Sequence, residues 1–540
     1  MNRIKIIIII MVVAALSLVI MPAAQGAGIA QEAPTITVVT PAAGVAGIPV
    51  SIQGSGFGPL QGLISKITFN GVDAGQAIYW SDALIWVIVP ATATTGPVVV
   101  TTLLEASNPV QFTILEQPPA IPSYFAEGTT RSGFEEWLTL YNPFDVQVTA
   151  TVTYLIADAA NRIRYYNVPA HARVNIYVNS EIGSDHDVSV SVTASERLFV
   201  ERPMYFNYKN KWSGGHTTQP ALATSNTWYF AEGTTRSGFE EWLCMGNPGI
   251  TDANVNVTYI FSDGNSVTLP YTVPAFKRHT IDVNATIGPE ADVALKVESD
   301  QPLVAERPMY FNYRSNWNDG SITLGARAPA TTWYFAEGTT RSGFEEWLCL
   351  ANPQTEDATV HVTYHKAGAE DSDQYIDVPA GRRRTIDVNA VLGPEVDAAV
   401  KIDSDKAIIA ERPMYFNYQN KWNGGHVSIG TNSTAGNWYL AEGTTRSGFE
   451  EWICLLNPGE LEAAIHVEYS FQDGSTQDQD LLLMPDQRFS ILVNGVVGTG
   501  KDVAVKIESD QGIIAERSMY FSYHEAWDGG SNAIGCVPPD

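Results

Sequence analysis

Basic residues are scarce in this chain of 540 residues. Lys and Arg together number 32 against 59 Asp and Glu, which gives a net charge of −27. Nucleic acids and anionic membranes bind clustered Lys and Arg, so the charge argues against both as partners. The acidic surplus is compatible with calcium association, but the sequence contains no EF-hand-type run. We therefore expect no cofactor.

Cysteine is also rare, and its four positions do not predict a disulfide framework. Cys244, Cys349 and Cys454 recur at steps of 105 residues. In successive domains they would lie farther apart than the roughly 4.4–6.8 Å between Cα atoms that a disulfide requires. We expect three small buried thiols on strands. The sequence leaves open whether Cys454 and Cys536 pair.

Long apolar runs are lacking except near the start of the chain. Arg3 and Lys5 precede the apolar segment 6–20, and small residues follow at 24–27. This order is typical of a signal peptide, and an apolar run of about 15 residues is short for a membrane span. We expect residues 1–26 to be cleaved rather than kept as an anchor. The mature protein would then be secreted or held at the cell surface, without membrane insertion.

Long helical periodicity is absent, while runs rich in Val, Ile, Thr, Tyr and Phe alternate with Gly, Pro, Asn and Asp. This pattern predicts an all-β fold. Repeat units of about seven short strands indicate tandem immunoglobulin-like β-sandwiches, arranged as beads on a string about 150 Å long. The predicted segments are a signal peptide 1–26, a β-sandwich 34–115, a Pro-rich linker 116–122, and repeats 123–223, 224–328, 329–433 and 434–540.

Two marker motifs define the repeats. The first, FAEGTTRSGFEEW, runs from Phe125 to Trp137 and returns three times at steps of 105 residues, with Leu440 replacing the first Phe in the last copy. The second, ERPMYFNY, begins at Glu201 and keeps the same step with small changes in the last copy. Four copies without a net insertion indicate four tandem units of one fold. Segments between the motifs, such as 157–168, differ among the copies, so we expect no pocket built from shared loops.

Both parts of the chain resemble known modules. The markers of 34–115 resemble the IPT/TIG immunoglobulin-like domain, with Thr40-Pro41, the turn around Gly56-Phe57, the strand Phe69 to Val72, and Gly96-Pro97 before a run of Val. The AEGTT…ERPMYFNY combination over 123–540 resembles a repeat of exported bacterial proteins whose function is uncharacterised. These resemblances imply export and modularity, but they imply no particular chemistry.

The invariant charged residues predict a structural clamp. Strand alternation places acidic and basic side chains at the ends of apolar faces, where Arg can bind a carboxylate through two hydrogen bonds. We expect Arg131 or Arg202 to pair with Glu127, Glu135 or Glu136 and to join the first and last strands of each domain. The candidate ion-pair residues are Glu127, Arg131, Glu136, Arg202, Glu232, Arg236, Glu241 and Arg307.

Two sharper interpretations of the same acids are disfavoured. Glu127, Glu135 and Glu136 would resemble the acid/base set of a glycoside hydrolase only if two carboxylates faced one sugar. Four identical active sites in a row would require shared loops to form their clefts, which the copies lack, and the same acids form no recognised metal motif. We expect no enzymatic activity.

Four Trp residues beside glycines are candidates for surface contact. They are Trp212, Trp317, Trp422 and Trp527. A Trp in this setting can be an exposed platform for a sugar or a neighbouring domain. The alternative is a Trp folded onto the end of its own β-sandwich, which the sequence favours.

The sequence thus predicts a non-catalytic extracellular protein that acts as a surface stalk, adhesin or envelope component. The alternatives are a carbohydrate-binding array that uses the repeated Trp residues, or an accessory region of an extracellular enzyme. Expected partners are a cell-envelope polysaccharide or a surface protein. The sequence gives no indication of the oligomeric state.

Overall fold

The computed structural model describes residues 33–44, 49–62, 64–103, 105–114 and 121–537. The predicted signal peptide at 1–26 and most of the predicted linker lie outside these ranges. Strands make up almost all of the regular structure, with four helices of five residues each in the described part, so the all-β prediction is confirmed. Within these ranges, no helix has the length and apolar character needed to span a membrane.

The N-terminal domain is a β-sandwich. Its strands are β1 (Thr35–Thr40), β2 (Ala43–Gly44), β3 (Pro49–Ser55), β4 (Lys66–Phe69), β5 (Val72–Asp73), β6 (Tyr79–Trp80), β7 (Leu84–Ile88), β8 (Gly96–Thr101) and β9 (Val110–Ile114). One sheet has the order β1-β3-β7-β6 and the other β2-β9-β8-β4-β5. Ile52, Ile67, Val98 and Phe112 are buried in the core between them.

Repeat 1 folds into two four-stranded sheets. Its elements are β10 (Ser123–Phe125), β11 (Phe134–Asn142), β12 (Val148–Ile156), β13 (Arg162–Val168), β14 (Ala172–Tyr177), α1 (Val178–Ile182), β15 (Val188–Ala194), β16 (Phe199–Tyr208) and β17 (Trp212–Thr218). The outer sheet has the order β10-β15-β12-β13, and the inner sheet has the order β14-β11-β16-β17. The second marker motif lies in β16 of the inner sheet, and the first runs from the end of β10 into β11 of the inner sheet.

Repeats 2 to 4 keep this plan with one difference. In each of them the two strands that correspond to β15 and β16 of repeat 1 are continuous and form one strand of 21 residues, which runs through both sheets. Repeat 2 contains β18 (Ser225–Phe230), β19 (Phe239–Asn247), β20 (Ala253–Phe261), β21 (Ser266–Val273), β22 (Lys277–Asp282), α2 (Val283–Ile287), β23 (Val293–Tyr313) and β24 (Trp317–Leu324). Repeat 3 contains β25 (Ala330–Phe335), β26 (Phe344–Asn352), β27 (Ala358–Lys366), β28 (Ser372–Val378), β29 (Arg382–Asp387), α3 (Val388–Leu392), β30 (Ala398–Tyr418) and β31 (Trp422–Ile429). Repeat 4 contains β32 (Ala435–Leu440), β33 (Phe449–Asn457), β34 (Ala463–Phe471), β35 (Thr476–Leu483), β36 (Gln487–Leu492), α4 (Val493–Val497), β37 (Val503–Tyr523) and β38 (Trp527–Ile534).

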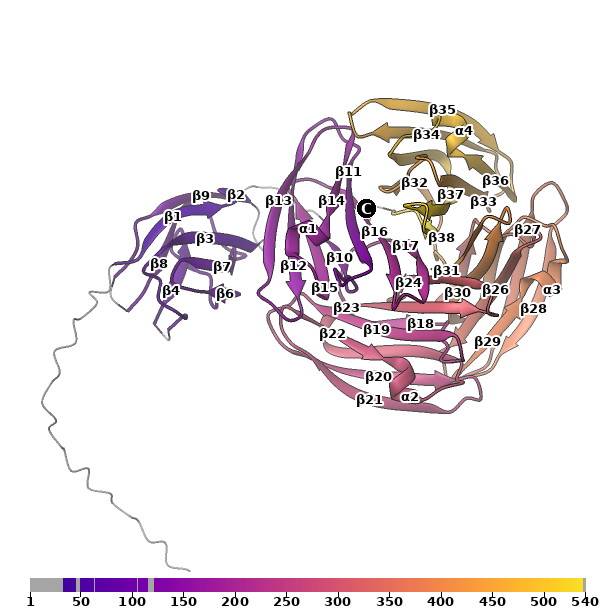
Figure 1. Cartoon of the computed structure of the whole chain (residues 1–540), viewed down its shortest axis with the longest axis horizontal. Helices are drawn as coiled ribbons and strands as arrows, with labels where there is room; N and C mark the ends of the chain where they lie inside the picture. The colour runs from indigo at the N-terminus through magenta and orange to yellow at the C-terminus, as the bar shows by residue number, and fades with distance from the viewer. Residues whose placement is uncertain (1–32, 45–48, 63, 104, 115–120, 538–540) are drawn as a thin grey trace, which may run out of the picture.

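The four repeats form a closed ring (Figure 1). Their last strands, β17, β24, β31 and β38, are the innermost strands and contact one another around the centre. Because β17 contacts β38 as well as β24, repeat 4 closes against repeat 1. The inner sheets therefore stand like the blades of a propeller. The predicted beads-on-a-string arrangement, with its length of about 150 Å, is wrong.

Buried ion pairs join each repeat to the next. Arg202, Arg307 and Arg412 have no exposed surface, and their guanidinium groups lie 3.0, 2.8 and 2.9 Å from carboxylates of the following repeat. Arg517 completes the circle by pairing with Glu201 of repeat 1 at 2.8 Å. The other three acceptors are Glu306, Glu411 and Glu516. A buried charge without a partner costs several kcal/mol, so each repeat requires its neighbour.

Aromatic rings interlock at the same boundaries. The rings of Tyr205 and Tyr523 stack with centroids 3.8 Å apart at the junction of repeats 1 and 4. Tyr313 stacks on Tyr415 at 3.9 Å at the junction of repeats 2 and 3. Such pairs add about 0.5–1.5 kcal/mol beyond the burial of apolar surface. Packing and ion pairing therefore both favour the ring.

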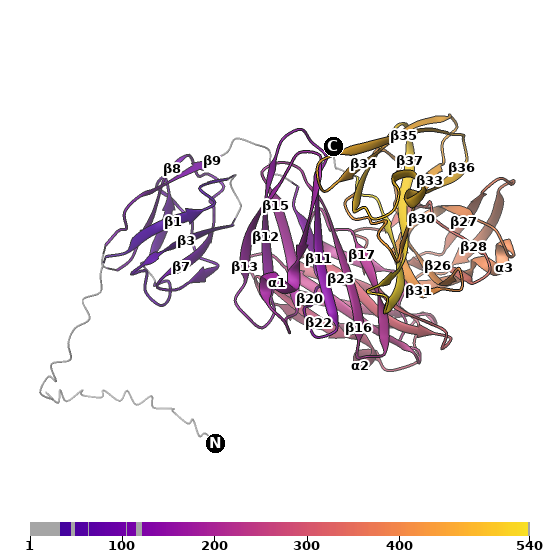
Figure 2. The same cartoon turned by 45° about the horizontal axis from the view of Figure 1, so that its top comes forward.

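The N-terminal domain lies against the outer sheet of repeat 1 (Figure 2). The hydroxyl of Tyr165 donates a hydrogen bond to the backbone oxygen of Thr40 at 2.6 Å. Repeat 1 carries Ser191 and Thr193 on this sheet, whereas repeat 2 has the ion pair Lys296–Glu298 at the corresponding positions. The outer sheet of repeat 1, which lies near the N-terminal domain, therefore has no ion pair at these two positions.

The described cysteines, all four of them, are free thiols. Cys244, Cys349 and Cys454 are buried, as the sequence predicts. Cys454 and Cys536 do not form a disulfide.

Replacing a ring-joining arginine should destabilise the ring far more than replacing an exposed one. Arg307→Ala leaves Glu411 buried without a counter-charge, so we expect a loss of about 3–5 kcal/mol in the free energy of unfolding. Arg236 lies in the same repeat and forms an exposed pair with Asp292. Its replacement by Ala should cost less than about 1 kcal/mol. Urea unfolding of both variants measures the difference, and equal losses would contradict the assigned role of Arg307.

Candidate functional site

Clefts lie between neighbouring repeats, where the first marker motif of one repeat meets the inner sheet of the next. The cleft between repeats 1 and 2 has a volume of about 200 Å³, and the cleft between repeats 3 and 4 about 510 Å³. We call these the inter-repeat clefts. Side chains that line the larger one include Glu337, Thr339, Arg341, Phe344, Asp397 and Tyr418 from repeat 3, and Glu450, Trp452, Cys454, Arg488 and Tyr520 from repeat 4.

An exposed ion pair recurs at the rim of these clefts. Arg131 donates a hydrogen bond to Asp187 at 2.7 Å, and its side chain is 63% exposed. The equivalent pairs are Arg236–Asp292, Arg341–Asp397 and Arg446–Asp502. An exposed pair contributes only about 0.2–1 kcal/mol to stability. Stability therefore gives little reason for four identical copies, and repeated exposed polar residues favour a role in binding.

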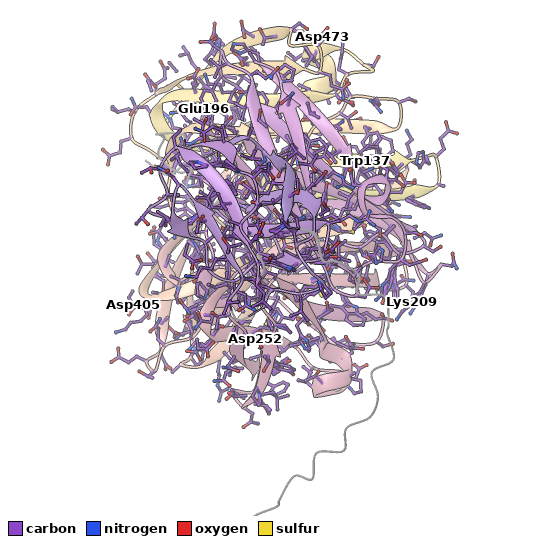
Figure 3. All side chains as sticks on the ribbon, turned by 90° about the vertical axis from the view of Figure 1, so that its left-hand side faces the viewer. Trp137, Glu196, Lys209, Asp252, Asp405 and Asp473 are labelled. Carbon is purple, nitrogen blue, oxygen red and sulfur yellow. The ribbon has the colours of Figure 1, made fainter. Side chains whose placement is uncertain are left out.

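Aromatic side chains form one wall of each cleft. In the smaller cleft, Phe134 lies 5.8 Å from Tyr208 and 6.2 Å from Tyr310 of the next repeat, measured between ring centroids. Trp242 lies on the same wall and is partly exposed. The hydroxyl of Tyr208 donates to Glu240 at 3.1 Å. Lys209, labelled in Figure 3 and half exposed, also bonds Glu240, so the edge of the wall is charged.

A buried carboxylate lies at the base of the smaller cleft. Glu127 accepts hydrogen bonds from Arg278 at 2.8 Å and from the Cys244 thiol at 2.7 Å. Burial and the neighbouring Glu127 hold the pKa of the Cys244 thiol well above its usual range. A nucleophilic cysteine requires a lowered pKa, so this thiol is a hydrogen-bond donor rather than a nucleophile.

The larger cleft differs at this base. Arg488 occupies the position of Arg278, but its guanidinium lies 3.7 Å from Asp397 and it donates to the backbone oxygen of Ala336. It forms no ion pair with Glu337, the counterpart of Glu127, within the described part of the chain. The base is therefore less tightly closed where the volume is greater.

A second buried acid lies behind each marker motif. Burial raises the pKa of Glu136 to about 8, against the opposing effect of Arg202. In the part that the structure describes, neither carboxyl oxygen of Glu136 has a hydrogen-bond partner. A Cβ atom on Gly128 would lie 2.7 Å from one of these oxygens, so the close approach requires glycine. The equivalent acids Glu241, Glu346 and Glu451 also have a pKa of about 8.

The predicted clamp pairs differently from the expectation. Arg202 donates to the backbone oxygen of Glu127 in its own repeat, but its carboxylate partner is Glu306 of the next repeat. The carboxylate of Glu127 likewise pairs across the boundary, with Arg278, and Glu232 pairs with Arg383. Glu127, Arg202, Glu232 and Arg307 thus lie at the junctions between repeats instead of joining strands of one domain. Arg131 and Arg236 pair with Asp187 and Asp292 of their own repeats, not with the glutamates of the motif. Glu136 and Glu241 form no ion pair among the described residues.

The four predicted contact tryptophans are not exposed platforms. Trp212 and Trp422 are buried, and Trp317 and Trp527 are partly buried. Each packs against a tyrosine of its own repeat, as Trp212 does against Tyr208 with ring centroids 5.6 Å apart. This matches the alternative in which the Trp folds onto its own domain.

Several cleft residues were missed from the sequence. Asp187 and its counterparts at 292, 397 and 502 keep the step of 105 residues, as do the tyrosines at 208, 313, 418 and 523. The last residue of the first marker motif, Trp242 in repeat 2, also faces a cleft. The constant spacing of exposed residue types is the signal that would have identified them. No cluster of metal-ligating side chains occurs in the part of the chain that the structure describes.

No family model matches the chain, and no curated protein is similar to it. Among solved structures, a Thermotoga maritima protein designated 1070 is 21% identical over 19% of this chain and 94% of its own, with a TM-score of 0.18. The Anabaena sensory rhodopsin transducer is 28% identical over 16% of this chain and 87% of its own, with a TM-score of 0.14. SGBP-B from a complex xyloglucan utilization locus in Bacteroides uniformis is 12% identical over 74% of this chain and 100% of its own, with a TM-score of 0.13. At these TM-scores the similarities carry no functional argument.

Replacing a buried acid should change how stability depends on pH. The folded pKa of Glu241 is about 8 against an ordinary value of 4.5, so between these pH values the folded state holds a proton that the unfolded state releases. The contribution of Glu241 therefore falls as pH rises through this window, by about 1.4 kcal/mol for each pH unit. As the pH rises from about 5 to about 8, the free energy of unfolding should therefore fall less for Glu241→Gln than for the wild type.

The control for this experiment is Glu298→Gln, which removes an exposed carboxylate of the same repeat and measures the effect of charge alone. Parallel pH profiles for the wild type and Glu241→Gln would show that Glu241 is not a buried neutral acid.

Proposed function

We propose that this protein is a non-catalytic extracellular binding protein, and that each inter-repeat cleft binds one unit of a saccharide chain. The observation that carries the proposal is the fourfold repetition of an exposed Arg–Asp pair beside an aromatic wall. At a partly exposed position of the outer sheet the copies differ, since Ser191 of repeat 1 is replaced by Lys296 in repeat 2.

Saccharides fit the chemistry of the clefts. A sugar ring presents C–H groups on its faces, which pack on aromatic side chains, and hydroxyl groups at its edge. Arg341 and Asp397 offer planar donors and acceptors for hydroxyls at the rim of the larger cleft. Tyr418 and Trp452 supply an aromatic surface with polar ends, a combination suited to partly wet binding sites. The volume of the larger cleft, about 510 Å³, lies within the range that is typical of small-molecule sites.

The geometry favours binding over catalysis. Glycoside hydrolysis uses two carboxyl groups that flank one sugar. In the smaller cleft the carboxylate of Glu127 is already bonded to Arg278 and Cys244. The rim carboxylate Asp187 is bonded to Arg131. Neither acid is left to donate a proton, which supports a binding role.

The ring also bears on the predicted role as a stalk. Because repeat 4 returns to repeat 1, the repeats do not extend like a spacer. A surface or envelope location follows from the predicted signal peptide, and an envelope polysaccharide is then the natural partner. The two clefts differ in volume, so the larger one accommodates more of such a chain.

Loss of one rim arginine should remove one binding site. Isothermal titration of the intact protein with a panel of oligosaccharides is expected to identify a ligand that occupies both inter-repeat clefts. Arg341→Ala should then lower the number of sites by one and leave the affinity of the others unchanged, because the clefts are separate.

Lys406→Ala is the matched control, since Lys406 forms an exposed pair with Glu356 and lines neither cleft. It should leave both the number of sites and the affinity unchanged. Absence of binding to every saccharide in the panel, or an unchanged number of sites in Arg341→Ala, would overturn the proposal.

A further inference from the structure

One aspartate lies at the centre of the ring. Asp319 has no exposed surface and belongs to β24, one of the four innermost strands. Its carboxylate accepts hydrogen bonds from four backbone N–H groups. Oδ1 accepts from Gly215 at 3.1 Å and Gly320 at 2.8 Å, and Oδ2 accepts from Gly425 at 3.2 Å and Gly530 at 3.1 Å. Each N–H comes from a different repeat.

The fold explains why these donors converge. The innermost strand of each blade is an edge strand, paired on one side only, and an edge strand presents unpaired N–H groups. Four such edges face one another around the ring centre. Buried N–H groups require acceptors, since each unsatisfied one costs about 1–3 kcal/mol. A single carboxylate, with two oxygens and about four lone-pair sites, satisfies all four.

The four repeats are not equivalent at this point. The positions that correspond to Asp319 are Gly214, Gly424 and Gly529. A Cβ atom on Gly214 would lie 1.7 Å from Oδ1 of Asp319, and a Cβ on Gly424 would lie 2.6 Å from Oδ2. Three glycines thus make room for one carboxylate. None of these glycines has a positive φ, so their backbone also permits a side chain.

All four partners of Asp319 are donors. Both oxygens must therefore act as acceptors, and a proton on either would face an N–H group. The four N–H groups favour the charged carboxylate and act against burial, which raises the pKa of Asp319 well above its usual range. A neutral amide of the same shape would fit poorly, because its NH₂ group would oppose the donors.

We propose that the centre of the ring is an anion-binding site built from four backbone N–H groups, and that Asp319 is its resident ligand. The site recognises a carboxylate group, whichever of the four repeats supplies it. It accepts a carboxylate from another repeat, or a small free carboxylate when no side chain fills it. This site is separate from the inter-repeat clefts and does not depend on their function.

Acetate tests the site because it is the side chain of aspartate without its backbone. In Asp319→Gly, we expect Tm to fall and then to rise with acetate concentration, since a ligand that binds only the folded state stabilises it. Acetamide, the neutral isostere, should not raise Tm. The wild type in the same acetate series measures the general effect of salt. Asp528→Gly is the matched variant, because Asp528 lies in the corresponding hairpin of repeat 4 but bonds none of the four N–H groups.

An exchange variant tests the same site without added ligand. Gly214→Asp alone places a second carboxylate against Asp319 and should lower Tm. Gly214→Asp combined with Asp319→Gly moves the carboxylate from repeat 2 to repeat 1 at unchanged composition. We expect it to restore most of the Tm lost in Asp319→Gly and to abolish the response to acetate.

The outcomes are distinct. Acetate-specific recovery of Asp319→Gly, together with rescue by exchange, supports the site. If Asp319→Gly does not fold, folding of the exchange variant supports it and failure of that variant overturns it. Stability of Asp319→Gly equal to the wild type, or an acetate response no greater than that of the wild type, also overturns it.

Discussion

The structure depends on the need of each buried arginine for a carboxylate that its own repeat does not supply. Arg202, Arg307, Arg412 and Arg517 are completely buried, and each finds its partner in the next repeat around the ring. A guanidinium removed from water and left unpaired is far more costly than an exposed one. In a linear array, Arg517 of the last repeat and Glu201 of the first repeat would lack their partners. Closure satisfies both, so the ring and the burial of these charges are one arrangement.

This constraint places the candidate functional residues. The buried side of the first marker motif stabilises the boundary between repeats, because Glu127 accepts hydrogen bonds from side chains of the next repeat. Its exposed side presents Arg131 and Phe134 to the cleft. The repeated motif therefore has one side that stabilises the ring and another side that faces the cleft. The structural face accounts for Glu127 and Gly128, whereas stability does not account for an arginine that is 63% exposed.

The all-β character of the chain could be predicted from the sequence, because runs of alternating apolar residues are visible without coordinates. The constant step of 105 residues likewise led us to predict four tandem units. The sequence did not predict the ring. In a chain of identical copies, Arg202 can meet a given glutamate of its own repeat or the equivalent glutamate of the next repeat, and the motif is the same in both cases. Only three-dimensional geometry separates Glu201 from Glu306 as a partner. Asp319 escaped notice for the opposite reason, since it departs from the repeat pattern and occurs once.

Ring closure also fixes the copy number. In an open solenoid each repeat contacts only its neighbours along the chain, so units can be gained or lost at little structural cost. Here β17 of the first repeat contacts β38 of the fourth, so both ends of the array are already occupied. Duplication or deletion of one 105-residue segment would therefore disturb the contact that closes the ring. The sequence is that of an array that could gain or lose repeats, whereas the closed structure depends on the present number of repeats.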